Sequence, residues 1–300
     1  MTRRGAVLFV ALSVIWGIPY LLIRVAVRSL DPAVLVFGRT LVGAAVLLPF
    51  ALRSGVMKAV LARWKWVAVF GLIEIALPWY LLGDAEQHLP SAFTGMCVAV
   101  VPIIGAVIAR FGPGRERLDR LRLAGLVVGL VGVVLLLGSN VSAQGVTPLA
   151  LVEVMIVTLC YAFGPAIAAW RLASVPAIGV NAAAITGVAV GYCIPAIIRW
   201  PHEMPPAAAI WSVVCLGLVC TALAFVVFFA LIKEIGPSRA TVITYVNPVV
   251  ALVLGVLILG EHVTAGMAIG FPLVLVGSVL ATRKARGADR RGLDVTAVPS

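Results

Sequence analysis

Charged residues are scarce in this chain of 300 residues, where they occupy only 12% of the positions. A soluble domain is about a quarter charged and about half apolar. Here 62% of the residues are hydrophobic and the mean hydropathy is +1.14. So few charged side chains do not cover such an apolar surface, and the composition excludes a soluble globular protein. A lipid bilayer must therefore supply an apolar solvent for most of the chain.

Several chemical signatures are also missing. No lysine lies between a glycine-rich loop and a Ser or Thr, so ATP-driven pumping by a Walker A site is not expected. Neither H-E-x-x-H nor G-x-S-x-G occurs. We expect no enzyme activity, no cofactor and no metal site. All five cysteines lie in apolar stretches without C-x-x-C pairs, and they are interpreted as small buried hydrophobes: Cys97, Cys160, Cys193, Cys215 and Cys220.

The net charge of +11 raises the question of nucleic acid. However, the Lys and Arg residues lie between apolar runs and form no patch on a folded domain. We therefore expect no nucleic-acid partner and interpret the charge as a sign of membrane topology.

Ten apolar segments are long enough to cross a bilayer, which takes about 20 helical residues. They are continuously apolar, whereas strands of a β-barrel would alternate. The predicted limits are 6–27, 33–52, 66–86, 91–110, 121–139, 148–170, 177–199, 208–232, 238–259 and 264–282.

Charge placement predicts the orientation of these spans. With the N-terminus in the cytoplasm, nearly all Lys and Arg residues fall on the cytoplasmic side, and Arg39 lies within a span. The opposite side receives only Arg24, Arg28 and Arg199. The positive-inside rule therefore predicts a multi-pass protein of the cell (inner) membrane with both termini in the cytoplasm. The first apolar run is interpreted as a signal-anchor helix.

The chain also repeats itself. Val100-Val101-Pro102-Ile103 corresponds to Val246-Asn247-Pro248-Val249 at an offset of 248 − 102 = 146, and Trp16 corresponds to Tyr161 at 161 − 16 = 145. The predicted units are residues 1–145 and 146–285, followed by a basic cytoplasmic tail, 286–300. Because five spans are an odd number, the second unit enters the membrane inverted, as is common in secondary transporters.

In both halves, the repeat resembles the EamA family of the drug/metabolite transporter superfamily. The resemblance rests on Trp16-Gly17, Asp31-Pro32, Arg39, Tyr245-Val246-Asn247-Pro248-Val249 and Gly260-Glu261. It implies a ten-helix fold, a central cavity between the two units, and export or exchange of small metabolites, commonly amino acids or drug-like compounds. Asn247 stands where many relatives carry Glu, which argues against a proton-coupling acid there. The fold class is thus an all-α integral membrane protein of ten transmembrane helices in two inverted five-helix repeats.

Two ionisable residues lie deep within predicted spans. Glu74 is about eight residues inside the third span, and Arg39 is about six residues, or roughly 9 Å, inside the second. Intramembrane charges are costly and mark functional sites by default. Glu74 is predicted to bind a cationic group or a proton, or to pair with Arg39. Arg39 is predicted to bind a substrate carboxylate or to serve a structural or gating role, and the family resemblance favours the latter.

The remaining candidates are aromatic, amide or proline residues near mid-span. Substrate-lining candidates are Trp16, Tyr20, Trp79, Tyr161, Tyr245 and Asn247, and hinge candidates are Pro102 and Pro248.

Residues near the span ends are predicted to be structural. Asp84, Glu86 and His88 are interpreted as a solvated rim, with an acidic vestibule as the alternative, and Glu153 as snorkelling to the interface. Glu116 and Glu261 are predicted to cap the fifth and tenth helices. The spacings Gly125-x-x-x-Gly129 and Gly266-x-x-x-Gly270 allow close packing, either within the chain or in a homodimer.

The predicted function is secondary transport of small organic metabolites, amino acids or related compounds, by alternating access. Proton coupling, the direction and the substrate are left open. One alternative is an efflux carrier of drug-like or cationic compounds. Another, from a different class, is an integral-membrane enzyme or lipid-handling protein.

Overall fold

The computed structural model describes residues 2–111, 119–141, 147–236, 240 and 242–282. Every element in this part of the chain is helical. The first half contains α1 (Arg3–Gly17), α2 (Pro19–Ala26), α3 (Pro32–Arg53), α4 (Met57–Ala62), α5 (Trp64–Phe70), η1 (Gly71–Ala76), α6 (Leu77–Ala85), α7 (Ser91–Val98), α8 (Val101–Phe111) and α9 (Arg120–Val141). The second contains α10 (Pro148–Arg171), α11 (Ala177–Ile198), α12 (Ala207–Gly217), η2 (Leu218–Leu223), α13 (Ala224–Ile235), α15 (Ile243–Leu259) and α16 (Ala265–Thr282).

These elements form ten helical segments in the described residues. Nine are long and apolar enough to cross a membrane, and the tenth, Ile243–Leu259, is a shorter apolar helix. The fold class predicted from the sequence is thereby confirmed. The described helix of the ninth span is Ile243–Leu259, and the predicted start of this span, residue 238, lies outside the described residues.

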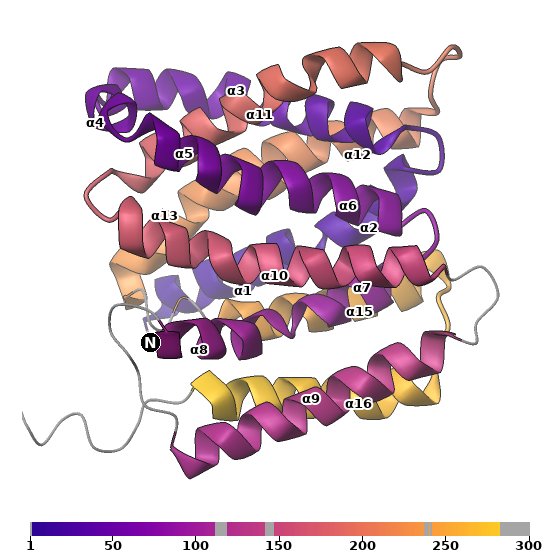
Figure 1. The fold of residues 1–300 in the computed structure, drawn as a ribbon. Helices are drawn as coiled ribbons and strands as arrows, with labels where there is room; N and C mark the ends of the chain where they lie inside the picture. Colours follow the sequence, from indigo (N-terminus) through magenta and orange to yellow (C-terminus); the bar gives the residue numbers. More distant parts are fainter. Residues whose placement is uncertain (1, 112–118, 142–146, 237–239, 241, 283–300) are drawn as a thin grey trace, which may run out of the picture.

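The segments alternate in direction along one axis. Arg3 and the ends of α3 and α10 lie at one end of the bundle, here called the Arg3 end. The starts of α3 and α10 and the ends of α6 and α11 lie at the other, here called the Asp31 end after the residue that precedes α3. The first helix of the second half therefore runs opposite to the first helix of the chain (Figure 1).

Four spans are interrupted near their middle. The first breaks between α1 and α2 at Pro19, and the fourth breaks before Pro102, because proline removes a backbone donor. The third and eighth spans each contain a single π-helical turn, η1 and η2. The two turns stand at equivalent places of the repeat, offset by 218 − 71 = 147 residues. Such turns are frequent at functional sites.

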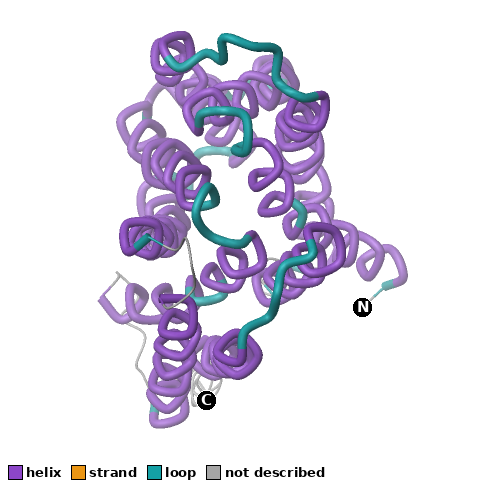
Figure 2. Tube along the Cα trace, turned by 90° about the vertical axis from the view of Figure 1, so that its right-hand side faces the viewer, coloured by secondary structure: helices purple, strands orange, loops and turns teal. Residues whose placement is uncertain are grey.

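The fifth and tenth spans form a close pair at one edge of the bundle. Figures 1 and 2 both place α9 and α16 together at the bottom of the molecule. A Cβ at Gly277 would lie 2.4 Å from the Cα atom of Gly129, and one at Gly270 would lie 2.7 Å from the carbonyl oxygen of Gly132. The helix backbones therefore touch where glycine removes the side chain. The glycine spacing at Gly125 and Gly129 thus serves packing within this chain.

Candidate functional site

Arg39 is the centre of a buried polar group within the bundle. Its side chain projects from α3 and is only 7% exposed. The guanidinium carbon lies 3.5 Å from the centroid of the Trp79 ring on α6, and Nε donates to the Thr221 hydroxyl on η2 at 3.3 Å. A desolvated cation over an indole gains about 2 kcal/mol. In the described part of the chain, the two terminal nitrogens of Arg39 make no hydrogen bond, so they remain available to an anion.

Glu74 supplies a carboxylate to the same region. It projects from the π-helical turn η1, and its Oε2 atom is buried without a hydrogen-bond partner among the described residues. Gly164 of α10 faces it so closely that a Cβ there would lie 1.8 Å from Oε2. The glycine is required at this point because any other side chain would displace the carboxylate.

Two tyrosines connect these charges. Tyr161 on α10 lies within electrostatic range of both Arg39 and Glu74, and it shares a side-chain hydrogen bond with Trp79. Tyr20 on α2 lies within range of Arg39 and Tyr161 and packs in the same apolar cluster as Tyr161. The group therefore combines residues from both halves of the chain, as expected for a site at a repeat interface.

Thr221 belongs to this group but was not predicted. Its hydroxyl donates to the Leu216 carbonyl, five residues earlier, at 2.8 Å, and accepts from Arg39. The internal repeat could have predicted it, because Thr221 corresponds to the site residue Glu74 at an offset of 221 − 74 = 147. Sequence comparison at an offset of 146 aligns Cys220 instead, and only the two π-helical turns reveal the shift.

Five of the eight predicted substrate-lining residues thus come together: Tyr20, Arg39, Glu74, Trp79 and Tyr161. The other three have different neighbours. Trp16 packs on Phe228 of α13 with ring centroids 5.1 Å apart. Tyr245 donates to the Ser278 carbonyl of α16 at 3.3 Å. The Asn247 amide, oriented to satisfy its contacts, donates to the Ser13 and Ile243 carbonyls at 3.3 and 3.0 Å. A substrate contact for these three stays a prediction.

The two predicted hinge prolines differ in their surroundings. Pro102 follows the break between α7 and α8, whereas Pro248 lies inside the continuous helix α15. Their repeat equivalence therefore does not extend to the local backbone, and a hinge role for either residue stays a prediction.

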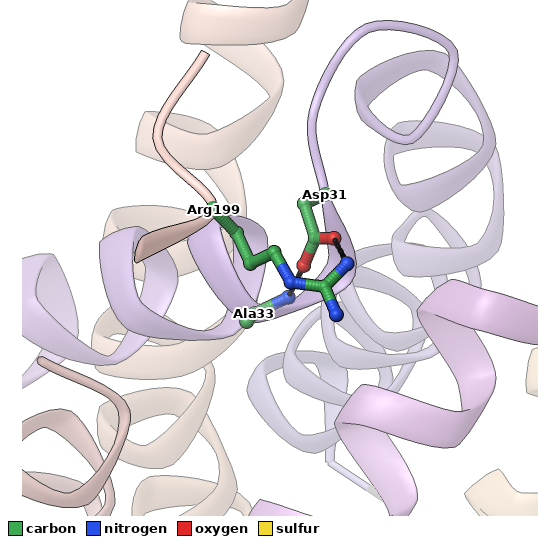
Figure 3. A network of polar contacts seen from close by, with 3 residues as sticks. All are labelled: Asp31, Ala33 and Arg199. Carbon is green, nitrogen blue, oxygen red and sulfur yellow. Dashed lines mark hydrogen bonds and ion pairs between the residues drawn. The ribbon is translucent and has the colours of Figure 1, made fainter. Parts of the chain in front are cut away.

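A cavity of about 480 Å³ lies at the Asp31 end, between α3, α6 and α11. Asp31 caps α3 by accepting from the backbone N–H of Ala33 at 2.8 Å, and it contacts Arg199 at 3.4 Å (Figure 3). Tyr80 and Tyr192, with ring centroids 6.1 Å apart, line the same cavity. The Arg199 side chain is 66% exposed, so this ion pair stabilises little by itself. None of the central residues lines this cavity.

Three expectations about acidic residues were wrong. Glu86 is not part of a solvated rim, because its side chain is 0% exposed. Glu153 does not snorkel to the interface; it is 7% exposed and lies beside Asp84. Glu261 does not cap the tenth helix but accepts from the backbone N–H groups of Ser91 and Ala92, both at 2.8 Å, at the start of α7. Glu116 lies outside the described residues.

No cluster of three or more His, Cys, Asp or Glu side chains suited to a metal ion occurs among the residues that the structure describes. The central group contains a cation, a carboxylate, hydroxyls and aromatic rings, and this set of groups is suited to binding an organic solute.

Comparison with known proteins agrees with this fold. The model of the EamA-like transporter family matches residues 3–138 and 149–283, in accordance with the two repeats. The uncharacterized inner membrane transporter YedA of Escherichia coli (strain K12) is 29% identical over 91% of this chain and 88% of its own length. One solved crystal structure, 24% identical, superposes with a TM-score of 0.65 over 93% of this chain and 97% of the other, which shows a shared fold.

Two further relatives are named as exporters. The aromatic amino acid exporter YddG of Ancylobacter novellus is 27% identical over 82% of this chain and 85% of its own length. A probable terminal-alkyne amino-acid exporter of Streptantibioticus cattleyicolor is 25% identical over 97% of both chains. With both halves matched by the family model, this multi-pass membrane protein belongs to the EamA-like transporter family and is a transporter, not an enzyme.

Proposed function

We propose that this protein exports or exchanges amino acids or closely related zwitterions across the cytoplasmic (inner) membrane by alternating access. The observation that carries the proposal is the pair of opposite charges in the central group. In the described chain the terminal nitrogens of Arg39 make no hydrogen bond and Oε2 of Glu74 is buried without a partner, and Tyr161 interacts with both residues.

A zwitterion matches this arrangement. Its carboxylate pairs with the guanidinium fork, whose planar geometry suits a bidentate contact. Its ammonium group pairs with Glu74, and the rings of Trp79, Tyr20 and Tyr161 offer apolar and cation–π surface to the side chain. Two relatives that bear amino acid exporter in their names support the same substrate class.

The orientation is part of the proposal. Arg3, Arg53, Arg63, Arg110 and Arg171 lie at the Arg3 end, whereas Arg24, Arg28 and Arg199 lie at the Asp31 end. By the positive-inside rule, the Arg3 end and both termini face the cytoplasm. The name of the relative YedA supports an inner-membrane location.

A second candidate function is efflux of hydrophobic cations. It is favoured by the Glu74 carboxylate, whose buried Oε2 atom has no hydrogen-bond partner among the described residues and which lies near the Tyr161 ring. In this case Arg39 would hold the helices together through Trp79 and Thr221 without touching the substrate.

Flux into and out of proteoliposomes tests both candidates. The panel contains aromatic and aliphatic amino acids, their decarboxylated amines and tetraphenylphosphonium. For a zwitterion carrier, amino acids move but amines do not, and both Arg39→Gln and Glu74→Gln lower the apparent affinity at least about tenfold. The exposed residues Arg28 and Glu203 supply matched controls, Arg28→Gln and Glu203→Gln. Transport of amines and tetraphenylphosphonium that survives Arg39→Gln would replace the zwitterion proposal by the cation proposal.

A further inference from the structure

A second buried polar group lies at the Asp31 end, where α6, α7, α2 and the segment after α15 meet. Its central residue is Glu86, immediately after α6. The side chain is 0% exposed, and neither carboxyl oxygen has a hydrogen-bond partner in the described chain. The hydroxyl of buried Ser91 likewise has no partner among the described residues. An ionised carboxylate without hydrogen-bond partners has a high free-energy cost in such surroundings, so burial favours the protonated form of Glu86.

The neighbours of Glu86 strengthen this conclusion. Glu261, an acid from another element that interacts electrostatically with Glu86, accepts two backbone N–H bonds at the N-terminus of α7. Burial, and to a smaller extent the negative charge of Glu261, raise the pKa of Glu86 well above its usual range. Glu86 therefore binds a proton more readily than an exposed carboxylate does.

The remaining charges do not cancel this effect. Arg24 on α2 lowers the pKa of Glu86, but it donates to the backbone carbonyl of Glu86 and leaves the carboxyl oxygens without a hydrogen bond. The eight residues of α7 include no charged side chain. Asp84 and His88 flank Glu86 on its own segment, and exposed Gln87 and His88 connect this segment with the aqueous surface.

Tyr20 connects this group with the central site. Its side chain is buried against α7, where a Cβ at Gly95 would lie 3.3 Å from the Tyr20 ring, and it interacts electrostatically with both Glu86 and Arg39. A change of charge at Glu86 therefore alters the field at the residues proposed to bind the substrate carboxylate, and binding of an anion at Arg39 alters the proton affinity of Glu86 in return.

We propose that Glu86 is a proton-binding site at the Asp31 end, coupled through Tyr20 to the central site around Arg39. The carboxylate takes up one proton from the adjacent aqueous phase and releases one proton in each transport cycle. Coupling of this proton to a moving solute rests on the proposed function, whereas the protonation itself does not.

Infrared spectroscopy of the reconstituted full-length protein tests the protonation directly. Spectra are recorded from about pH 4.5 to about pH 9, a range that brackets ordinary and raised carboxyl pKa values. The wild type is expected to show a protonated-carboxyl band that disappears only well above the usual carboxyl range. Glu86→Gln removes this band, Glu86→Asp retains it at a shifted position, and Glu203→Gln leaves it unchanged. Equal titrating bands in the wild type and in Glu86→Gln would overturn the proposal, as would a band that responds to sodium and not to pH.

Flux measurements then test the coupling. The rate of the wild type is expected to change by up to about tenfold per pH unit on the Asp31 side, as for one obligatory proton. Glu86→Gln flattens this profile, and Tyr20→Phe shifts it. A Glu86-dependent band without flux of any solute means that the proposed substrate class is wrong but the proton site is real. Flux whose pH profile is the same in Glu86→Gln disproves the coupling.

Discussion

The guanidinium of Arg39 is stacked on the ring of Trp79 at 3.5 Å while its Nε donates to Thr221, so three spans meet at one buried cation. Trp79 belongs to the first repeat and Thr221 to the second. This contact joins the two halves, and the proposed alternating access would require them to move relative to each other at this place.

Lysine is not an adequate replacement at this position. Arg39→Lys keeps the positive charge but loses the planar group that stacks on Trp79 and offers a fork to a carboxylate. We expect at least about a tenfold loss of apparent substrate affinity, equivalent to about 1.4 kcal/mol. Concentration-dependent uptake in proteoliposomes measures it, with Arg28→Lys at an exposed position as the control. Unchanged affinity in Arg39→Lys would mean that the residue supplies only charge.

Gly164→Ala is expected to disturb the site although it replaces no charged residue. The new methyl group would lie 1.8 Å from Oε2 of Glu74, so the carboxylate must rotate away. Transport should then fall toward the level of Glu74→Gln, a loss of about tenfold or more. A suitable control is Gly191→Ala on α11, where a Cβ meets no atom within 4 Å. Equal flux in the two alanine variants would show that the position of Glu74 does not matter for transport.

The glycine contact between α9 and α16 makes a prediction about stability. In Gly277→Ala the added Cβ would lie 2.4 Å from Gly129 Cα, and the two helices must separate. Overpacking of this kind costs about 1–3 kcal/mol. Thermal unfolding in detergent should occur at a lower temperature than in Gly138→Ala, a change on α9 that meets no neighbouring atom. If both variants unfold at the same temperature as the wild type, the interface accommodates the added methyl group without loss of stability.

The pH dependence of unfolding follows from Glu86. Its pKa is raised in the folded protein, so the folded state holds a proton that the unfolded chain releases. Stability should therefore decrease as the pH rises from the ordinary carboxyl pKa to the raised one, by at most about 1.4 kcal/mol per pH unit. Glu86→Gln should remove this slope, whereas Glu203→Gln at an exposed site should not. Denaturation of wild type and variants at a series of pH values measures it; a slope that persists in Glu86→Gln assigns it to another group.

Much of the architecture could be predicted from the sequence, because membrane solvation acts on composition and segment length. A backbone in lipid must satisfy its own hydrogen bonds, so each apolar run long enough to cross the bilayer becomes a helix. The repeat at an offset of 145–146 residues and the depth of Glu74 and Arg39 are likewise properties of the linear chain. For these reasons ten helices, two related halves and five members of the central group were predicted.

Tertiary structure decided which side chains meet, because helix rotation and local backbone distortions depend on packing between distant segments. The π-helical turns make Thr221 the structural equivalent of Glu74 and place its hydroxyl against Arg39. Alignment of the linear repeat pairs Glu74 with Cys220 instead. Tyr245 contacts α16, where its hydroxyl donates to the Ser278 carbonyl. Glu86 and Glu261 lie at the ends of different spans and become neighbours only when α7 packs against α15. This packing places a fully buried acid, predicted from the sequence to lie in a solvated rim, beside the acid that caps α7.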